Sequence, residues 1–298
     1  ISGNHLSSEA EVTLDIIVAD VNSAYFGIPG PIDYSDHSLI ENLTITDNVI
    51  EAPYGFGIHI IGANLGNSDN LLRNTRIISN TITNVMYTGI SLTAGDGGSE
   101  ERGSDNNGIE GVEIRRNTIT QTWVGISIAG AGTGNQPGGS NNRVENVLIA
   151  DNAISDYTGS GIFLIGGDSS SNEVSENLLD QVIISRNNIQ QILYQGSAVG
   201  LDATGGSSIG GLSRRNMIRG LHILNNQISQ SGTGVQIFGG CGTGAEDNQV
   251  VLVEMQGNTL LGNTVPLDIR DNVDGAMGNT VITLSERLYL PLVFRGAS

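Results

Sequence analysis

Residues 112–130 read VEIRRNTITQTWVGISIAG, and this stretch decides the fold of the chain. Its first part, VEIRRNTI, places apolar residues around an asparagine in the order apolar-x-apolar-x-x-N-x-apolar, and its last part contains the alternating block GISI. Alternation with a period of two is typical of a short β-strand, and the stretch lacks the 3.6-residue apolar stripe of a helix. We therefore expect short strands joined by polar corners.

The same pattern occurs in seven segments with a mean spacing of about 35 residues, which indicates a repeat protein. The anchor positions are Ile45, Ile77, Ile114, Ile149, Ile184, Ile223 and Met255. A second alternating block follows each segment, as in GIHI from Gly57, and an aliphatic residue stands five residues before each anchor. Two residues before that aliphatic residue stands an asparagine in six of the seven repeats, and Asn279 begins what looks like an eighth.

One such unit cannot bury its own apolar face, whereas stacked units pair each strand with its copies at about 4.8 Å. The sequence therefore predicts an all-β fold: a single-stranded, right-handed parallel β-helix of about 7–8 rungs, with three short strands in each. We expect one domain, with a partial rung and an irregular insertion in 1–41, the repeats in 42–282, and a tail or cap in 283–298.

The asparagine of each repeat is expected at a sharp corner between two strands. Asparagine tolerates the left-handed backbone that such corners favour, and stacked amides can form hydrogen bonds from rung to rung. The first column of corner asparagines is Asn48, Asn80, Asn117, Asn152, Asn187, Asn226 and Asn258.

Composition excludes several classes of partner. The chain has 42 glycines, no lysine and a formal net charge of −18, so it lacks the basic surface that nucleic acids and anionic membranes require. No apolar run approaches the roughly 20 residues of a membrane span. The single cysteine, Cys241, cannot form an internal disulfide.

The N-x-I and G-I-x-I motifs resemble the right-handed parallel β-helix repeat superfamily over about residues 40–282. This resemblance implies a secreted bacterial β-solenoid, extracellular or at the cell surface. It leaves the activity open, because the superfamily includes pectate lyases, polygalacturonases, phage tailspikes, adhesins and structural surface proteins.

The outward positions of neighbouring rungs are where polysaccharide-cleaving β-helices place their catalytic groups. The outward column of the G-I-x-I strand is expected to be His59, Ser91, Ser127, Phe163, Gly200, Gln236 and Asp268, without a carboxylate pair on adjacent rungs. On the first strand, Arg116, Asp151 and Arg186 alternate in charge. They predict a salt-bridge ladder or, alternatively, the arginine base and acidic site of a lyase.

One large aromatic residue lies between the first and second strands of five successive repeats: Tyr54, Tyr87, Trp123, Tyr157 and Tyr194. These rings are expected either to cover a corner of the core or to form a platform for sugar rings, which makes a polysaccharide a candidate partner.

Acidic residues gather in loops of variable length on one edge of the solenoid, where solvated turns and calcium sites are the two alternatives. The tightest cluster is DIRDNVDG, in which Asp268, Asp271 and Asp274 are candidate Ca²⁺ ligands.

The two ends suggest self-association. Ile1, Asn4 and Leu6 repeat the rung pattern, whereas Leu288, Leu290, Leu292 and Phe294 alternate in a C-terminal tail that would form a cap or a strand donated to a neighbour. The expected function is a structural solenoid that assembles with its own copies, end to end, into a filament or surface layer. The alternative is a carbohydrate-active protein that cleaves or binds a glycan.

Overall fold

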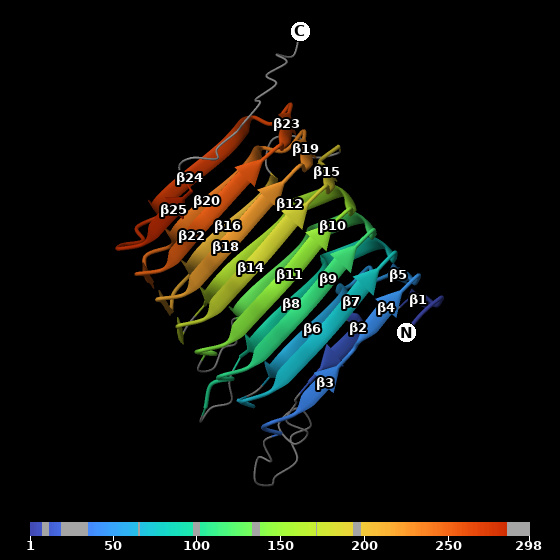
Figure 1. Ribbon diagram of the computed structural model, residues 1–298, viewed down its shortest axis with the longest axis horizontal. Helices are drawn as coiled ribbons and strands as arrows, with labels where there is room; N and C mark the ends of the chain where they lie inside the picture. The colour runs from blue at the N-terminus through green and yellow to red at the C-terminus, as the bar shows by residue number, and fades with distance from the viewer. Residues whose placement is uncertain are drawn as a thin grey trace.

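The computed structural model describes residues 1–7, 12–18, 35–64, 66–97, 102–132, 138–170, 172–192 and 198–284. Within these ranges every regular element is a β-strand and none is a helix. The strands of successive turns pair in parallel and form a β-solenoid of about seven turns, as the repeat predicts. Figure 1 shows these strands stacked in chain order from the N-terminus, in blue, to the last turns, in red.

The largest sheet has 13 strands. Its strands are β1 (His5–Ser7), β2 (Val12–Ile17), β5 (Val49–Glu51), β6 (Phe56–Asn64), β8 (Thr81–Asp96), β10 (Thr118–Gly132), β12 (Ala153–Ser169), β15 (Asn188–Gln190), β16 (Val199–Ser208), β19 (Gln227–Ser229), β20 (Thr233–Cys241), β23 (Thr259–Leu261) and β24 (Val265–Val273).

The second sheet has nine strands and the third has three. The nine are β3 (Leu39–Glu41), β4 (Thr44–Thr46), β7 (Leu71–Ile78), β9 (Gly108–Arg115), β11 (Arg143–Ala150), β14 (Leu178–Ser185), β18 (Met217–Leu224), β22 (Gln249–Gln256) and β25 (Thr280–Thr283). The three are β13 (Glu173–Ser175), β17 (Leu212–Arg214) and β21 (Ala245–Glu246).

The register of the repeats is confirmed. Each anchor of the first segment pairs with the next, from Ile45 with Ile77 to Ile223 with Met255. In the middle turns, however, the three short strands expected for each repeat merge into two long ones, such as β9 and β10. A residue with positive φ inside each long strand, for example Gln121 at 57°, bends it without ending the ladder.

Two buried columns of asparagine join the turns. In the first column, the backbone N–H and the Nδ2 group of Asn117 both donate to Oδ1 of Asn152, each at 3.0 Å. Asn4 donates to Asn48 in the same way, so residues 1–7 belong to a rung as predicted. The second column ends with Asn279, whose Oδ1 accepts from Asn248, and this confirms the eighth instance.

The left-handed backbone falls one residue earlier than predicted. Positive φ occurs immediately before the buried asparagines of the first column, at Asp47, Ser79, Arg116, Asp151, Arg186, Asn225 and Gly257. The asparagines themselves are at most 4 % exposed in the two columns. The turn directs their side chains into the stack, where the amide accepts the N–H of its neighbour, so the preceding residue takes the strained conformation.

A column of glycines fixes the register of the large sheet. A Cβ atom on Gly125 would lie 2.4 Å from the carbonyl oxygen of Gly161, and one on Gly161 would lie 2.6 Å from that of Gly200. Only glycine fits at these positions, since real Cβ atoms do not approach a carbonyl oxygen so closely. Gly200, and not Ala198, therefore occupies the place of Gly161 in the next turn.

We expect Asn152→Ala to lower the free energy of unfolding by about 3 kcal/mol, because it leaves the buried donors of Asn117 without their acceptor. Urea-induced unfolding measures the change. Asn188→Ala is the matched control, because Asn188 is exposed on β15, and its effect should stay within about 0.5 kcal/mol. Equal losses in the two variants would contradict the importance of the ladder.

Candidate functional site

The outward face of the large sheet carries the most unusual group of side chains. Leu201 and Ala203 on β16 belong to the buried core, so Asp202 between them points to the opposite side. In the register of the strands this column contains His59, Ser91, Ser127, Phe163, Asp202, Gln236 and Asp268. The prediction of Gly200 at this position was wrong. Gly200 aligns with Gly161 in the glycine column, so Asp202, two residues later, occupies the outward position next to Phe163.

A second outward column lies beside the first. Its members Ile61, Thr93, Ala129, Ile165, Thr204 and Phe238 are paired in sequence along the stack and are 2–8 % exposed. The apolar members lie outside the core cluster although they are buried. This face is therefore shielded from water along its middle, and charges at its edges lose hydration.

A third column completes what we call the acidic face. In this column Asp96 pairs with Gly132, and Asp168, Ser207 and Cys241 pair in succession. Asp96 and Asp168 lie within the long strands β8 and β12 and not in the variable loops. The acidic face is defined by these three columns of β6, β8, β10, β12, β16, β20 and β24.

Burial raises the pKa of three carboxyl groups on the acidic face. The pKa of Asp202 rises to about 6, although hydrogen bonds from Thr204 and Gln236 offset part of the effect. Burial also raises the pKa of Asp168, against hydrogen bonds from Ser207 and the Ser169 N–H, and that of Asp96, against the charge of His59. Carboxyl groups with raised pKa values are typical of acid–base sites.

Acids from neighbouring turns together affect the pKa of Cys241. Burial raises the pKa of its thiol, and the charge of Asp274 adds to the rise, followed by those of Asp202 and Asp168. Asp168 and Asp202 stand on adjacent turns, in β12 and β16. Moreover, Oδ1 of Asp168 is buried without a hydrogen-bond partner in the described part of the chain. A donor from a ligand would satisfy this atom.

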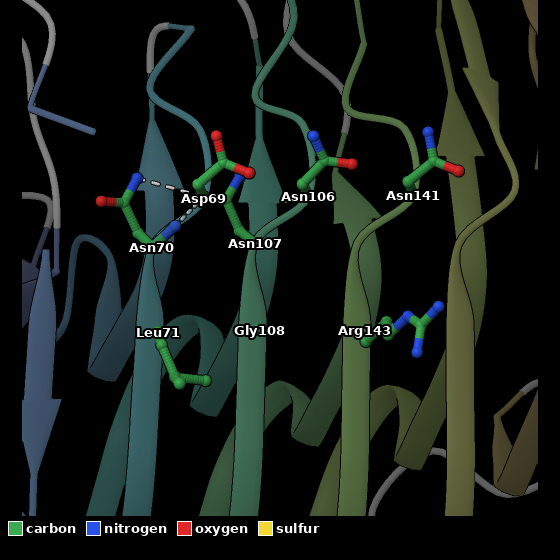
Figure 2. Close-up of a pocket in the computed structure, with 8 residues that line it drawn as sticks. All are labelled: Asp69, Asn70, Leu71, Asn106, Asn107, Gly108, Asn141 and Arg143. Atoms are coloured by element: carbon green, nitrogen blue, oxygen red, sulfur yellow. Dashed lines mark hydrogen bonds between the residues drawn. The ribbon is translucent and has the colours of Figure 1, made fainter. Parts of the chain in front are cut away.

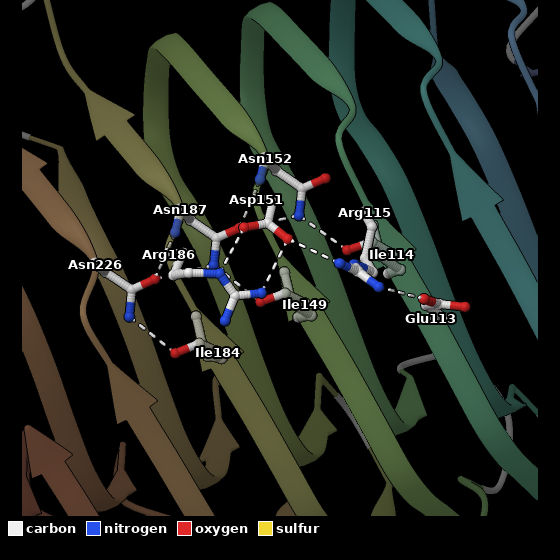
Figure 3. A network of polar contacts seen from close by, with 10 residues as sticks. All are labelled: Glu113, Ile114, Arg115, Ile149, Asp151, Asn152, Ile184, Arg186, Asn187 and Asn226. Carbon is white, nitrogen blue, oxygen red and sulfur yellow. Dashed lines mark hydrogen bonds and ion pairs between the residues drawn. The ribbon is translucent and has the colours of Figure 1, made fainter.

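The charge ladder lies elsewhere, and each of its charged groups has a partner of opposite charge. Asp151 accepts from Nε of Arg186 at 2.7 Å and from Nη2 of Arg115 at 3.1 Å, and Arg115 continues to Glu113 at 2.9 Å (Figure 3). These contacts, with that of Arg186 the strongest, lower the pKa of Asp151. A carboxylate held between two guanidinium groups stabilises the stack and is a poor acid or base.

The predicted ladder was wrong in one member. Arg115, one residue before Arg116, contacts Asp151, and no ion pair of Arg116 occurs within the described ranges. Arg116 has a φ of 54° at the corner and its side chain is exposed. Arg115 instead ends strand β9, from which its guanidinium reaches both Glu113 and Asp151.

The aromatic residues do not form one ladder. Tyr54, Tyr87 and Trp123 are 58, 39 and 55 % exposed, whereas Tyr157 is fully buried and its hydroxyl lies 2.6 Å from Oγ of Ser231. Burial raises the pKa of Tyr157 to about 12. The cause is its position in the register: Tyr157 pairs with the buried Thr122, whereas Trp123 stands one residue further along β10. Tyr194 lies outside the described residues.

The candidate calcium ligands do not converge. Asp268 pairs with Arg270 at 2.7 Å, Oδ1 of Asp271 accepts the Val281 N–H at 2.7 Å, and Asp274 lies 3.8 Å from the Cys241 thiol. Among the residues that the structure describes, no three His, Cys, Asp or Glu side chains form a group that could hold a metal ion. The arrangement therefore does not fit a Ca²⁺ site, which needs several oxygen ligands around one point.

A hollow of about 620 Å³ opens at the second asparagine corner. Figure 2 shows Asp69, Asn106 and Asn141 in a row at this corner, and Gly108 between the positions of Leu71 and Arg143. The missing side chain at Gly108 creates the space. The asparagines of this corner that are buried, such as Asn107, are already paired within the ladder.

Of the predicted assembly residues, Ile1, Asn4 and Leu6 lie in the first rung, where Ile1 is 51 % exposed. Leu288, Leu290, Leu292 and Phe294 lie outside the described residues. The described part of the chain also contains no helix long and apolar enough to cross a membrane.

No protein-family model matches this chain, and no curated protein matches it. Among solved structures, the catalytic domain of a GH87 α-1,3-glucanase in complex with tetrasaccharides is similar at 11 % identity and a TM-score of 0.20, over 97 % of this chain and 64 % of that chain. This chain thus spans less than two-thirds of that domain.

A TibC-catalysed hyper-glycosylated fragment of TibA is similar at 13 % identity and a TM-score of 0.15, over 94 % of this chain and 97 % of that fragment. TM-scores as low as these support no conclusion about the site in either case.

The raised pKa of Asp202 predicts how the free energy of unfolding depends on pH. The folded pKa of about 6 exceeds the ordinary value of 3.8, so the folded state binds more protons between these values and loses stability as the pH rises through them. Asp202→Asn keeps the acceptor for Thr204 and removes the titration. We expect it to be roughly 2 kcal/mol more stable than the wild type at pH 7 and equal to it at pH 4.

Urea-induced unfolding at the two pH values measures this difference. The exposed Asp47 provides the matched control variant Asp47→Asn. A loss of stability in Asp202→Asn at pH 7 would show that the Asp202 carboxylate is stabilised by a partner and is not strained by burial.

Proposed function

We propose that this protein is a secreted carbohydrate-active enzyme that hydrolyses a neutral polysaccharide on the acidic face. The observation that carries the proposal is the presence of Asp168 and Asp202, two buried carboxyl groups with raised pKa, on adjacent turns. Glycoside hydrolysis uses two carboxyl groups, one as an acid and one as a base or nucleophile. Asp168 lies opposite Ser207, five residues from Asp202 along β16, so a saccharide that contacts both acids would run across the strands as well as along the solenoid axis.

Asp202 takes the role of the acid, because its pKa of about 6 lets it hold a proton in mildly acidic solution and donate it to the glycosidic oxygen. The pKa of Asp168 is also raised by burial, and both carboxyl groups accept hydrogen bonds that oppose the rise. By elimination Asp168 takes the second role, in which a carboxylate activates water or stabilises the cationic sugar.

The electrostatics of the face favour a neutral substrate. Arg270 is the only arginine among the described residues of the three columns, and it is already paired with Asp268. The whole chain carries a formal charge of −18. A polyuronate would be repelled by this surface, and no lysine is present to neutralise its carboxylates.

Release of reducing ends from neutral polysaccharides, such as β-glucans, α-glucans, xylan and galactomannan, tests the proposal, with polygalacturonate as the acidic comparison. Asp202→Asn should lower kcat by at least about 100-fold, because it removes the general acid. Activity of the wild type should fall as the pH rises above about 6, since Asp202 then loses its proton.

Asp151→Asn is the control, because Asp151 belongs to the charge ladder and should retain activity if the protein is folded. Equal loss of activity in Asp151→Asn and Asp202→Asn would indicate that the active site lies at the charge ladder and not on the acidic face. The absence of cleavage of every neutral polysaccharide would refute the proposal.

End-to-end association is a second candidate function, favoured by exposed apolar side chains in both end rungs. Ile1, Leu39 and Val49 are 51, 53 and 40 % exposed in the first rungs. Val265 and Ile282 are 43 and 50 % exposed in the last ones. Apolar surface at both ends is what a head-to-tail contact between copies would bury, and repetition of that contact produces a filament.

Sedimentation velocity across a range of concentrations tests this association. We expect the mass to rise with concentration in the wild type and to stay monomeric in Ile282→Asp. Ile183→Asp is the matched control, because Ile183 is 37 % exposed on the side of the stack at β14. A monomeric wild type at high concentration would exclude the assembly.

A further inference from the structure

A second hollow, of about 330 Å³, lies near the start of the long strands β8, β10 and β12. Its lining includes Pro53, Asn84, Met86, Gln121, Trp123 and Asp156. The volume is at the lower end of small-molecule sites, which are commonly about 300–1,000 Å³. None of the residues described for the acidic face belongs to this lining.

One wall of the hollow is a row of polar side chains at rung spacing. Asn84, Gln121 and Asp156 occupy the same corner of three successive turns, with φ of 53, 57 and 56°. The left-handed backbone at this corner precedes the inward residues Val85, Thr122 and Tyr157, which are buried. The corner therefore presents an amide, an amide and a carboxylate side by side.

The other wall is apolar and exposed. Trp123 and Met86 are 55 and 54 % exposed. The indole of Trp123 lies against Gly159 of the next turn, where an added Cβ atom would be 2.6 Å from Nε1 and 2.8 Å from Cδ1. Because Gly159 has no side chain, the ring is supported by backbone on one side and remains available on the other.

Asp156 gives independent evidence for a ligand. Its Oδ1 atom is shielded from solvent and has no hydrogen-bond partner in the described structure. A shielded carboxylate oxygen without a donor is costly, and a hydroxyl group entering the hollow would satisfy it. Asn84 differs, because its Nδ2 already donates to Oε1 of Glu51 at 3.1 Å.

We propose that this hollow binds one sugar unit of a neutral glycan, with the C–H face of the ring on Trp123 and hydroxyl groups donating to Asp156 and Gln121. The combination of an exposed aromatic face with acceptor oxygens matches a sugar, which has an apolar face and a rim of donors. The lining has no basic side chain, so an anionic ligand does not fit.

A series of contacts between aromatic rings runs from the hollow to the acidic face. Tyr87, next to Met86, lies 5.5 Å from Phe56, and Phe56 stacks on His59 at 4.6 Å with an interplanar angle of 16°. His59 belongs to the first column of the acidic face. The glycan in the hollow is thus the same chain whose cleavage is proposed above. In this respect the inference rests on the proposed function, although binding can be measured separately.

The test uses the intrinsic fluorescence of Trp123, which is the only tryptophan of the chain. Neutral oligosaccharides of four to six units, prepared from β-1,3-glucan, β-1,4-xylan, β-1,4-mannan and α-1,3-glucan, are titrated into the full-length protein at millimolar concentration. At least one series should shift the emission and protect Trp123 from acrylamide quenching. No response to any of them would overturn the proposal.

Variants then locate the site by retardation in gels that contain the corresponding polysaccharide. Trp123→Ala and Asp156→Ala should each weaken binding by at least tenfold. Tyr54→Ala should bind as the wild type does, because Tyr54 is an equally exposed aromatic residue outside the lining. Retardation lost in Tyr54→Ala but kept in Trp123→Ala would contradict the assignment.

Asp202→Asn separates this inference from the proposed function. It should abolish cleavage and leave the fluorescence response unchanged. A response of Trp123 without cleavage by the wild type would refute the enzyme and keep the binding site. Cleavage without any response of Trp123 would refute the binding site and keep the enzyme.

Discussion

The rest of the structure depends on the hydrogen bond from each corner asparagine to the asparagine of the next turn. A buried amide and a buried backbone N–H must both find partners. Oδ1 of the asparagine one turn further on accepts from both, and the amide also donates to a backbone carbonyl of the preceding turn. The sequence separation between partners in the first column nevertheless varies from 32 to 44 residues. The ladders therefore hold the corners in register and force every difference in repeat length into the segments between them.

Because the corners are held in register and only the segments between them vary in length, a chain with irregular repeats can form the regular acidic face. The glycine column is a second fixed point, because each glycine leaves room only for the carbonyl group of the next. From each glycine the strand advances by the same two residues to the first outward column, so Asp202 falls between Phe163 and Gln236. A catalytic arrangement on such a face is positioned by backbone pairing over its whole width, which is the rigidity that a site requires.

The elements set by the two ladders could be predicted from the sequence, and those set by local irregularities could not. The anchors, both asparagine columns, Asn4 and Asn279 follow from a pattern that repeats in every turn. Asp202 was missed because the hydrophobic pattern alone places Gly200 in the outward column, although steric fit aligns Gly200 with Gly161. Tyr157 was misplaced because it stands one residue nearer the corner in the register than Trp123, and a step of one residue reverses the direction of a side chain.

The acids of this protein fall into two groups by the direction of their pKa shifts. Asp151 lies between two guanidinium groups, its pKa is lowered, and its charge contributes to stability at neutral pH. Asp96, Asp168 and Asp202 have raised pKa values because burial opposes their charge, so each of them destabilises the folded state when ionised. The same columns hold serine, threonine, glycine and glutamine on other turns. Stacking thus makes no demand for acids there, so their presence supports the proposal that the acidic face has a chemical role.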